Sequence, residues 1–267
     1  MLISLLAPPA RAADCLSSLQ AAAQGGDPAA AQACFAPDAQ WLDAGGAAQG
    51  PEGVRAGFER LARRRAKPEG ALAWTRLSTG TWLLTGLRDS AGQWVLLAAD
   101  LAGGPGFWQG ARVYAAARPW GAPKASDAAL PRDSARSPVM TASAVAADFN
   151  ATFTAGRVEE WLSRWTPDAE FVSVIGPFVG PEVGTFFRKQ AERYIPPTFT
   201  VTRDHGASPD GELVVEGVLD GRCRASGSPF AFPFIMTMRW RGELLSRVYE
   251  GFTAANDGCG PFWTSPR

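Results

Sequence analysis

Two stretches of the chain read almost alike and decide its fold: Ala36-Pro37-Asp38-Ala39-Gln40-Trp41-Leu42-Asp43 and Thr166-Pro167-Asp168-Ala169-Glu170-Phe171-Val172-Ser173. The match extends at one constant offset, without a gap, from Gly26 and Gly156 to Glu52 and Glu182. Farther along, Arg112-Val113-Tyr114 matches Arg247-Val248-Tyr249 at a slightly longer offset. Because this period is far too long for a solenoid, the repeat predicts two tandem copies of one globular domain.

The segment between the two copies is rich in Pro, Gly and small polar residues and has no hydrophobic period, which is typical of a linker. We therefore expect a first domain at 14–120, a linker at 121–141, a second domain at 142–257 and a C-terminal tail at 258–267. A chain of 267 residues is long enough for two small domains, each with its own core.

The order of elements within a copy predicts the fold class. In the second copy, Val145, Phe149 and Phe153 mark one face of a first helix, and a second helix is expected to carry Val158, Trp161, Leu162 and Trp165. A strand at 169–174, a third helix from Pro181 and four strands at 198–203, 212–224, 230–241 and 244–254 follow. This is an α+β pattern, with about three N-terminal helices packed on a curved antiparallel sheet.

Charge and composition exclude several classes of function. Lys plus Arg and Asp plus Glu number 26 each, so the basic surface that nucleic acid or an anionic membrane requires is not expected. No apolar run approaches the roughly 20 residues that span a bilayer. The single histidine, His205, excludes a site built on a His pair, and we expect it on an exposed hairpin. We expect no metal and no cofactor.

The four cysteines bear on the cellular compartment. Cys15, Cys34, Cys223 and Cys259 show no C-x-x-C spacing, and position along the chain favours the pairs Cys15–Cys34 and Cys223–Cys259. A helical hairpin turning at Asp27, with Asp27 as N-cap, would bring the first pair together. The alternative is four buried thiols in a cytoplasmic protein.

The N-terminal residues 1–13 are similar to the end of a secretory signal, because a short apolar run leads to Ala10-Arg11-Ala12. Together with the cysteines, this pattern favours a periplasmic or secreted protein. The alternative interpretation is an ordinary frayed terminus on a cytoplasmic protein.

The helical hairpin, the repeated Pro-Asp-Ala phrase, the helix led by Gly-Pro-Glu and the final meander resemble the ketosteroid isomerase and nuclear transport factor 2-like superfamily. The likeness is greatest to its SnoaL-like, polyketide-cyclase-like branch. The resemblance covers nearly all of both copies. It implies two cone-shaped domains, each enclosing an apolar pocket between sheet and helices. It also implies an intramolecular pseudo-dimer in place of the homodimer that is frequent in this superfamily.

The resemblance places candidate catalytic residues in the first copy. Asp43 falls on the general base of ketosteroid isomerases, and Asp100 falls on the acid that holds the oxyanion, kept protonated by Leu96, Leu97 and Leu101. The oxyanion-binding tyrosine of the first helix is replaced by Leu19, and Tyr114 is the candidate substitute. The alternative is structural: Asp43 caps a turn and Asp100 faces solvent. Trp41 and Arg112 are candidate ligand-binding residues of this copy.

The second copy lacks these carboxylates, because Ser173 stands at the position of Asp43 and Met236 at the position assigned to Asp100. Strand alternation predicts that Phe232, Phe234 and Met236 point inward. Such an aromatic set forms either a plain core or a ligand pocket. The full set of candidate ligand-binding residues in this copy is Phe149, Phe171, Ser173, Phe232, Phe234, Met236, Arg247 and Tyr249.

Two functions remain open from the sequence. The first is binding of an apolar small molecule in the pocket of one or both domains, with the second copy devoid of proton-transfer groups. The alternative is a cofactor-independent enzyme that isomerises, cyclises or dehydrates its substrate by proton transfer, using the first-domain carboxylates.

Overall fold

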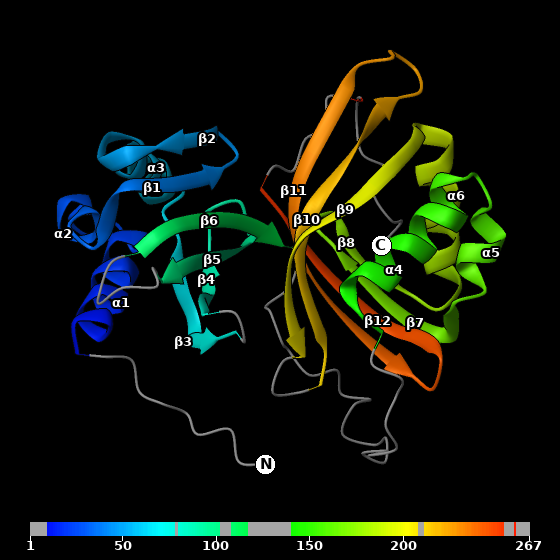
Figure 1. Cartoon of the computed structure of the whole chain (residues 1–267), viewed down its shortest axis with the longest axis horizontal. Helices are drawn as coiled ribbons and strands as arrows, with labels where there is room; N and C mark the ends of the chain where they lie inside the picture. The colour runs from blue at the N-terminus through cyan, green and yellow to red at the C-terminus, as the bar shows by residue number, and fades with distance from the viewer. Residues whose placement is uncertain are drawn as a thin grey trace. The chain divides into compact units, whose positions relative to one another are not determined.

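The structure, a computed structural model, describes residues 10–77, 80–101, 108–116, 140–207, 211–253 and 259 (Figure 1). Contacts divide the chain into two units, Met1–Arg76 with Gly80–Val113 and Leu77–Thr79 with Tyr114–Arg267. Most of the expected linker, and the expected tail apart from Cys259, lie outside the described residues. So do residues 1–9 of the expected signal segment, whereas Ala10–Ala12 belong to the first helix.

The first unit alternates short helices and strands before its meander. Its elements are α1 (Ala10–Ala23), α2 (Pro28–Gln32), β1 (Phe35–Asp43), β2 (Gly46–Gln49), α3 (Gly50–Arg63), β3 (Lys67–Arg76), β4 (Thr81–Arg88), β5 (Trp94–Leu101) and β6 (Trp108–Ala116). The strands lie in the order β3-β4-β5-β6-β1-β2, and β1 runs parallel to β6. Asp27 caps α2 by accepting a hydrogen bond of 2.8 Å from the Ala29 amide, as predicted.

The second unit repeats this topology. Its elements are α4 (Ala142–Phe149), the π-helical turn η1 (Asn150–Thr154), α5 (Val158–Leu162), β7 (Trp165–Ser173), β8 (Gly176–Val179), α6 (Pro181–Arg193), β9 (Tyr194–Ala207), β10 (Leu213–Cys223), β11 (Pro229–Arg241) and β12 (Leu244–Phe252). The strand order is β9-β10-β11-β12-β7-β8, with β7 parallel to β12. The α+β prediction is confirmed. The placement of Trp165 in a helix is wrong, because Trp165 begins β7 and packs from the sheet.

The glycines of the repeated segment keep a structural role in both copies. Gly50 and Gly180 adopt φ values of 77° and 57°, just where α3 and α6 begin after the short hairpin strand. This left-handed backbone conformation is costly for residues with a Cβ. A glycine with positive φ therefore precedes or begins the equivalent helix in each copy. This shared requirement explains why the two glycines stand at matching positions of the repeat.

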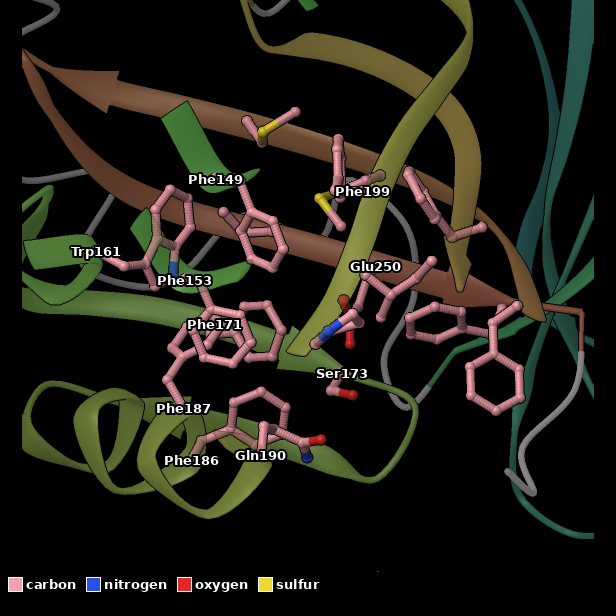
Figure 2. A pocket seen from close by; sticks show the side chains of 18 of the residues that line it. Phe149, Phe153, Trp161, Phe171, Ser173, Phe186, Phe187, Gln190, Phe199 and Glu250 are labelled. Carbon is pink, nitrogen blue, oxygen red and sulfur yellow. The ribbon is translucent and has the colours of Figure 1, made fainter. Parts of the chain in front are cut away.

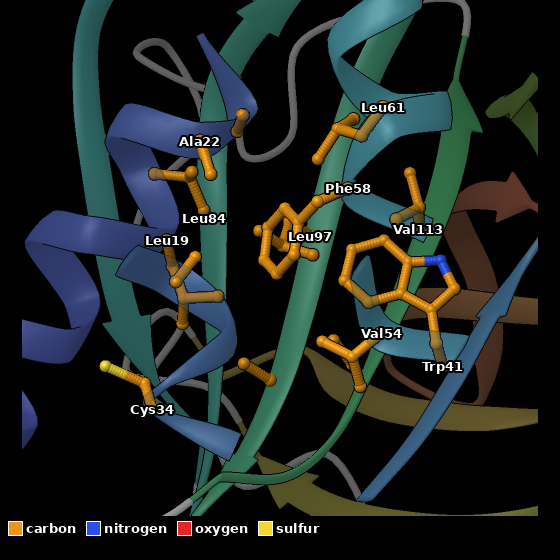
Figure 3. Close-up of a cluster of buried hydrophobic side chains, with 14 of the residues drawn as sticks. Leu19, Ala22, Cys34, Trp41, Val54, Phe58, Leu61, Leu84, Leu97 and Val113 are labelled. Carbon is orange, nitrogen blue, oxygen red and sulfur yellow. The ribbon is translucent and has the colours of Figure 1, made fainter. Parts of the chain in front are cut away.

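A tryptophan, Trp41, packs in the interior of the first unit (Figure 3). Trp41 on β1 is fully buried and lies against α3, 4.6 Å from Phe58 between ring centroids. A Cβ atom added at Gly57 would lie only 2.2 Å from the Trp41 ring. The indole therefore occupies the space that a side chain at position 57 would need, and aliphatic residues such as Val54, Leu61, Leu84 and Leu97 complete the core.

The interior of the second unit is built mainly from aromatic side chains. Phe171 and Phe187 stand at the positions equivalent to Trp41 and Gly57, and their ring centroids are 5.2 Å apart. The helical layer is fixed to the sheet by Asn150, whose side chain exchanges two hydrogen bonds of 2.9 Å with the backbone of Phe199. In the second unit, two phenyl rings, one on β7 and one on α6, thus pack where the first unit packs an indole ring against a glycine.

Both expected disulfides are present. Cys15 pairs with Cys34 across the α1–α2 hairpin, and Cys223 at the end of β10 pairs with Cys259. Disulfides persist in oxidising environments, so the pairing indicates a compartment other than the cytoplasm. Among the helices that the structure describes, none combines the length and the apolar character needed to cross a membrane.

Candidate functional site

A cavity of about 100 Å³ lies inside the second unit, between its helices and the concave face of its sheet (Figure 2). Aromatic side chains from both layers make up half of the lining residues, and aliphatic and thioether side chains make up most of the rest. The lining residues that carry a polar group besides the indoles of Trp161 and Trp165 are Ser173, Gln190, Tyr194 and Glu250. The interior is therefore apolar with a few polar groups, the usual composition of a small-molecule site.

Several residues expected from the sequence line this cavity. Alternation along β11 turns Phe232, Phe234 and Met236 toward the helices, as expected. Phe149 comes from α4, and Phe171 and Ser173 come from β7. Met236 faces this cavity whereas Asp100 does not face the core of its own unit, so the two positions are not structural equivalents, contrary to expectation.

The sequence patterns did not identify Glu250, the one carboxyl group among the described residues of the cavity wall. Glu250 lies on β12, is 6% exposed, and follows Val248 and precedes Phe252 on the inward face. Burial raises the pKa of Glu250 to about 8, although the hydrogen bond from the Ser173 hydroxyl opposes this shift. The second domain therefore holds a group that can exchange a proton near neutral pH, which contradicts the expectation that it has none.

Tyr249 was expected in the cavity and points to the other face of the sheet. Its hydroxyl is buried, and burial raises the pKa of Tyr249, against the effect of the neighbouring Arg247. Both faces of β12 are buried along its second half, so the usual contrast between apolar and polar positions is missing. Counting alternate residues back from Phe252 is the signal that would have identified Glu250 in place of Tyr249.

Arg247, another expected ligand-binding residue, also lies on the face away from the cavity. Its guanidinium Nε lies 3.7 Å from the Glu170 carboxylate on β7, and its Nη1 lies 4.0 Å from that of Glu212. The two strands pair with Glu170 opposite Arg247. Arg247 thus neutralises buried acidic groups on that face and does not line the cavity.

The Asp43 carboxylate in the first unit is held on every side. It accepts hydrogen bonds from Trp41 Nε1 at 2.8 Å, from the Gly45 amide at 2.7 Å and from Arg60 Nε at 2.9 Å. With 5% of its side chain exposed, it has little surface left for a substrate. These contacts agree with the turn-capping alternative, and they place Trp41 in the core next to Asp43.

The same positions in the second unit hold neutral residues. Ser173 and Gln190 stand where the repeat places Asp43 and Arg60 in the first copy, and both line the cavity. The second copy therefore has an uncharged pair where the first has an ion pair. Figure 2 shows Ser173 and Gln190 near Glu250 on one side, with Phe149, Phe153 and Trp161 on the other.

Asp100 lies on the opposite face of its sheet from the core. Its neighbours Leu97 and Ala99 belong to the first-unit core, whereas the Asp100 carboxylate contacts Arg112 at 2.5 and 2.9 Å and Thr81 Oγ1 at 2.7 Å. The structure does not bring Asp43 and Asp100 into one cavity, and Arg112 is the ion-pair partner of Asp100. Leu97, one of the leucines expected to keep Asp100 protonated, belongs to the core on the other face of the sheet.

Tyr114 takes part in a buried polar cluster of the second unit as the contacts define it. Its hydroxyl donates a hydrogen bond of 2.8 Å to Glu216, whose other carboxylate oxygen lies 2.7 Å from His205 Nε2. His205 is 1% exposed, so its expected place on an exposed hairpin is wrong. Tyr114 is not among the described residues that line the cavity. Among the described residues, no group of three or more His, Cys, Asp or Glu is arranged to hold a metal.

Two α+β domains of the same topology, each with helices packed on a mainly antiparallel sheet, define this protein as one that carries a single fold twice. The SnoaL-like domain family matches residues 17–98 and 146–248. The chain belongs to the SnoaL-like family and contains that domain twice. No curated protein matches the chain.

Solved structures similar to this chain each span about one domain of it. A ketosteroid isomerase-like protein from Catenulispora acidiphila, solved with trimethylamine, is 18% identical over 40% of this chain and 82% of its own, with a TM-score of 0.35. An NTF2-like protein from Anabaena variabilis is 19% identical over 42% and 84%, with a TM-score of 0.36. IdmH from Streptomyces antibioticus, proposed to be a polyketide cyclase, is 15% identical over 40% and 88%, with a TM-score of 0.34.

Proposed function

We propose that the second domain binds a small apolar molecule in its cavity, and that the first domain has no ligand of its own. The observation that carries the proposal is the contrast between the two copies. In the first copy the Trp41 ring occupies the space beside Gly57, whereas the second copy keeps about 100 Å³ of space walled by aromatic rings. Removing an apolar ligand from water into such a cavity is favoured by roughly 25 cal/mol per Å² of buried surface.

The size of the cavity limits the ligand. An engineered apolar cavity of about 150 Å³ is sufficient to bind benzene. A cavity of about 100 Å³ therefore suits a molecule of at most one ring or a short branched chain. Larger polycyclic ligands would require the helices to move away from the sheet.

Binding of benzene, followed by saturation-transfer NMR, tests this proposal. We expect binding to the intact chain and loss of binding in Val248→Phe, because the added ring would occupy the cavity from β12. Leu244→Phe is the matched control, since Leu244 is exposed on the same strand and its substitution leaves the cavity unchanged. Equal binding by all three proteins, or by none, would refute the proposal.

A proton-transfer enzyme is the second candidate, and Glu250 is the observation that favours it. A carboxyl group with a pKa of about 8 in an apolar cavity can both donate and accept a proton at neutral pH. Exchange of the α-protons of butanone in D₂O would detect such activity without knowledge of the substrate. Exchange that depends on Glu250 and not on Asp43 supports this function in the second domain, and the reverse dependence supports the first-domain alternative.

Pairing of the two domains as an intramolecular counterpart of a homodimer also stays a proposal. Its support is the duplication itself, since symmetric pairing of like subunits is the commonest mode of assembly. Separately expressed fragments 14–120 and 140–267 are expected to co-purify. Two stable fragments that do not associate would contradict the pairing.

A further inference from the structure

The charged and polar groups of the cavity wall restrict the chemistry of a ligand. Among the lining residues that the structure describes, Glu250 is the one that becomes charged when it ionises, and Lys, Arg and His do not occur. The amide of Gln190 and the hydroxyl of Ser173 carry no charge. A carboxylate or phosphate ligand would find no opposite charge in this wall, whereas a cation would find one.

The aromatic rings of the cavity wall also favour a positively charged ligand. The face of a phenyl or indole ring carries partial negative charge and attracts cations, most strongly when water is excluded. Phe171, Phe186 and Phe187 form one cluster, with ring centroids 4.7 to 5.2 Å apart, on the side of the sheet that carries Ser173. Their rings and the carboxyl group of Glu250 line one cavity.

The hydrogen bond of Ser173 to Glu250 also favours the ionised form of the carboxyl group. Ser173 is 3% exposed, so its hydroxyl has little access to water and is directed by its protein partner. An oriented hydroxyl beside a buried acid lowers the free-energy cost of its ionisation.

Resting on the proposed binding function, we propose that the ligand is a small primary amine whose ammonium group pairs with the Glu250 carboxylate while its apolar part packs among the phenylalanine rings. The cavity volume limits it to a short alkyl or single-ring amine. When the cation binds to protein in which Glu250 is protonated, the carboxyl O–H bond breaks and one proton is released to solvent. The amine itself keeps its proton, because alkylammonium groups ionise near pH 10.

This proton release gives the proposal a pH dependence of known sign. Below pH 8, each unit of decrease in pH raises the cost of ionising Glu250, so the affinity for the amine falls up to tenfold per unit. Above pH 8 the affinity reaches a plateau. Besides Glu250, the described lining residues from β7, α6, β9 and β11 include Ser173, Gln190, Tyr194 and Met236, of which Tyr194 is titratable. The Tyr194 hydroxyl accepts a hydrogen bond of 3.2 Å from Arg193 Nε.

The test compares n-butylamine with 1-butanol, which has the same number of heavy atoms and no charge. NMR titrations of the full chain at pH 6.5 and 8.5 give both affinities. We expect at least a tenfold preference for n-butylamine at pH 8.5 and a loss of more than tenfold in its affinity at pH 6.5. The affinity for 1-butanol should change little between the two pH values.

Two variants assign the preference to the carboxyl group. Glu250→Gln should lose the preference for n-butylamine and its pH dependence while still binding 1-butanol, because the isosteric amide cannot ionise to pair with the ammonium group. Ser173→Ala should keep the preference and shift the pH midpoint upward, because the carboxylate loses a donor. An equal or stronger affinity for 1-butanol in the unmodified chain, or a preference that persists in Glu250→Gln, would overturn the proposal.

The outcome also separates this proposal from the binding function on which it rests. If benzene or 1-butanol binds and n-butylamine does not, the amine proposal fails and the apolar site stands. If benzene, 1-butanol and n-butylamine all fail to bind, the proposed function itself is refuted.

Discussion

The Arg60 guanidinium donates to the Asp43 carboxylate at 2.9 Å, reaching from α3 to the end of β1. At the same two positions of the second copy, a serine and an amide line an apolar cavity. An ion pair in the first copy thus corresponds to an uncharged pair on the cavity wall of the second. The carboxylates that family likeness assigns to catalysis are engaged in structural ion pairs, and the acidic group of the open interior comes from the last strand.

Substitution of Asp43 tests this structural role. Asp43→Asn removes a charge-assisted hydrogen bond to Arg60 and should lower the free energy of unfolding by about 2 kcal/mol. Benzene binding should not change. Asp38→Asn, on the exposed part of the same strand, is the control and should have no measurable effect. Unchanged stability together with lost ligand binding or turnover would restore Asp43 as a functional residue.

Glu250 makes the stability of the protein depend on pH. Its pKa is about 8 in the folded chain and near 4.5 in the unfolded chain, so the folded state binds more protons between these values. Stability should therefore fall by about 1.4 kcal/mol per pH unit from about pH 4.5 to 8 from this group alone.

Denaturant unfolding of Glu250→Gln at pH 5 and pH 8 measures this contribution. The variant should have the higher free energy of unfolding at both pH values. The difference from the unmodified chain should be several times larger at pH 8 than at pH 5. A constant difference between the two proteins across this range would mean that the carboxyl group titrates as an exposed one.

The glycines of the two equivalent helices respond oppositely to alanine. At Gly57, a new Cβ would lie 2.2 Å from the rigid Trp41 ring. Gly57→Ala should therefore destabilise the protein by roughly 1–3 kcal/mol, the usual cost of overpacking a core. At Gly184 in α6, a Cβ would lie 3.1 Å from the end of the flexible Arg188 side chain, which can move aside. Gly184→Ala should gain up to about 1 kcal/mol from helix propensity. In thermal unfolding, the midpoint should fall for Gly57→Ala and rise for Gly184→Ala. A shift in the same direction for both variants would contradict the prediction.

The Cys15–Cys34 bridge should contribute roughly 2–4 kcal/mol to the stability of the first unit. The double substitution to serine removes it without leaving a free thiol. We also infer that the protein is exported, and that protein isolated from the periplasm has no alkylatable thiol under non-reducing conditions. Four alkylatable thiols would contradict both disulfides and the inference of export.

The architecture could be predicted from the sequence because the internal repeat indicates two domains with the same order of helices and strands. The glycines that start α3 and α6, the Asp27 cap and the order of elements are local features with local causes. Trp165 was misplaced because apolar spacing of three and four residues continues from α5 into β7. A short apolar segment does not show where one period ends and the other begins.

The candidate site was only partly predictable. Phe232, Phe234 and Met236 follow from alternation in a long strand, whereas Glu250 lies in a strand that is buried on both faces. The ion pairs of Asp43 and Asp100 could not be derived, because Arg60 and Arg112 reach them from other elements. The family resemblance therefore assigned catalysis to the first copy, in which Asp43 and Asp100 form ion pairs with arginines.

Trp41 seated on Gly57 has a consequence for how this protein could evolve. In an assembly of identical chains, every substitution occurs in each subunit, so a change that fills one interior fills them all. A duplicated domain within one gene escapes this constraint, because each half accumulates its own changes. One half can become a rigid scaffold while its sister remains free to explore new ligands.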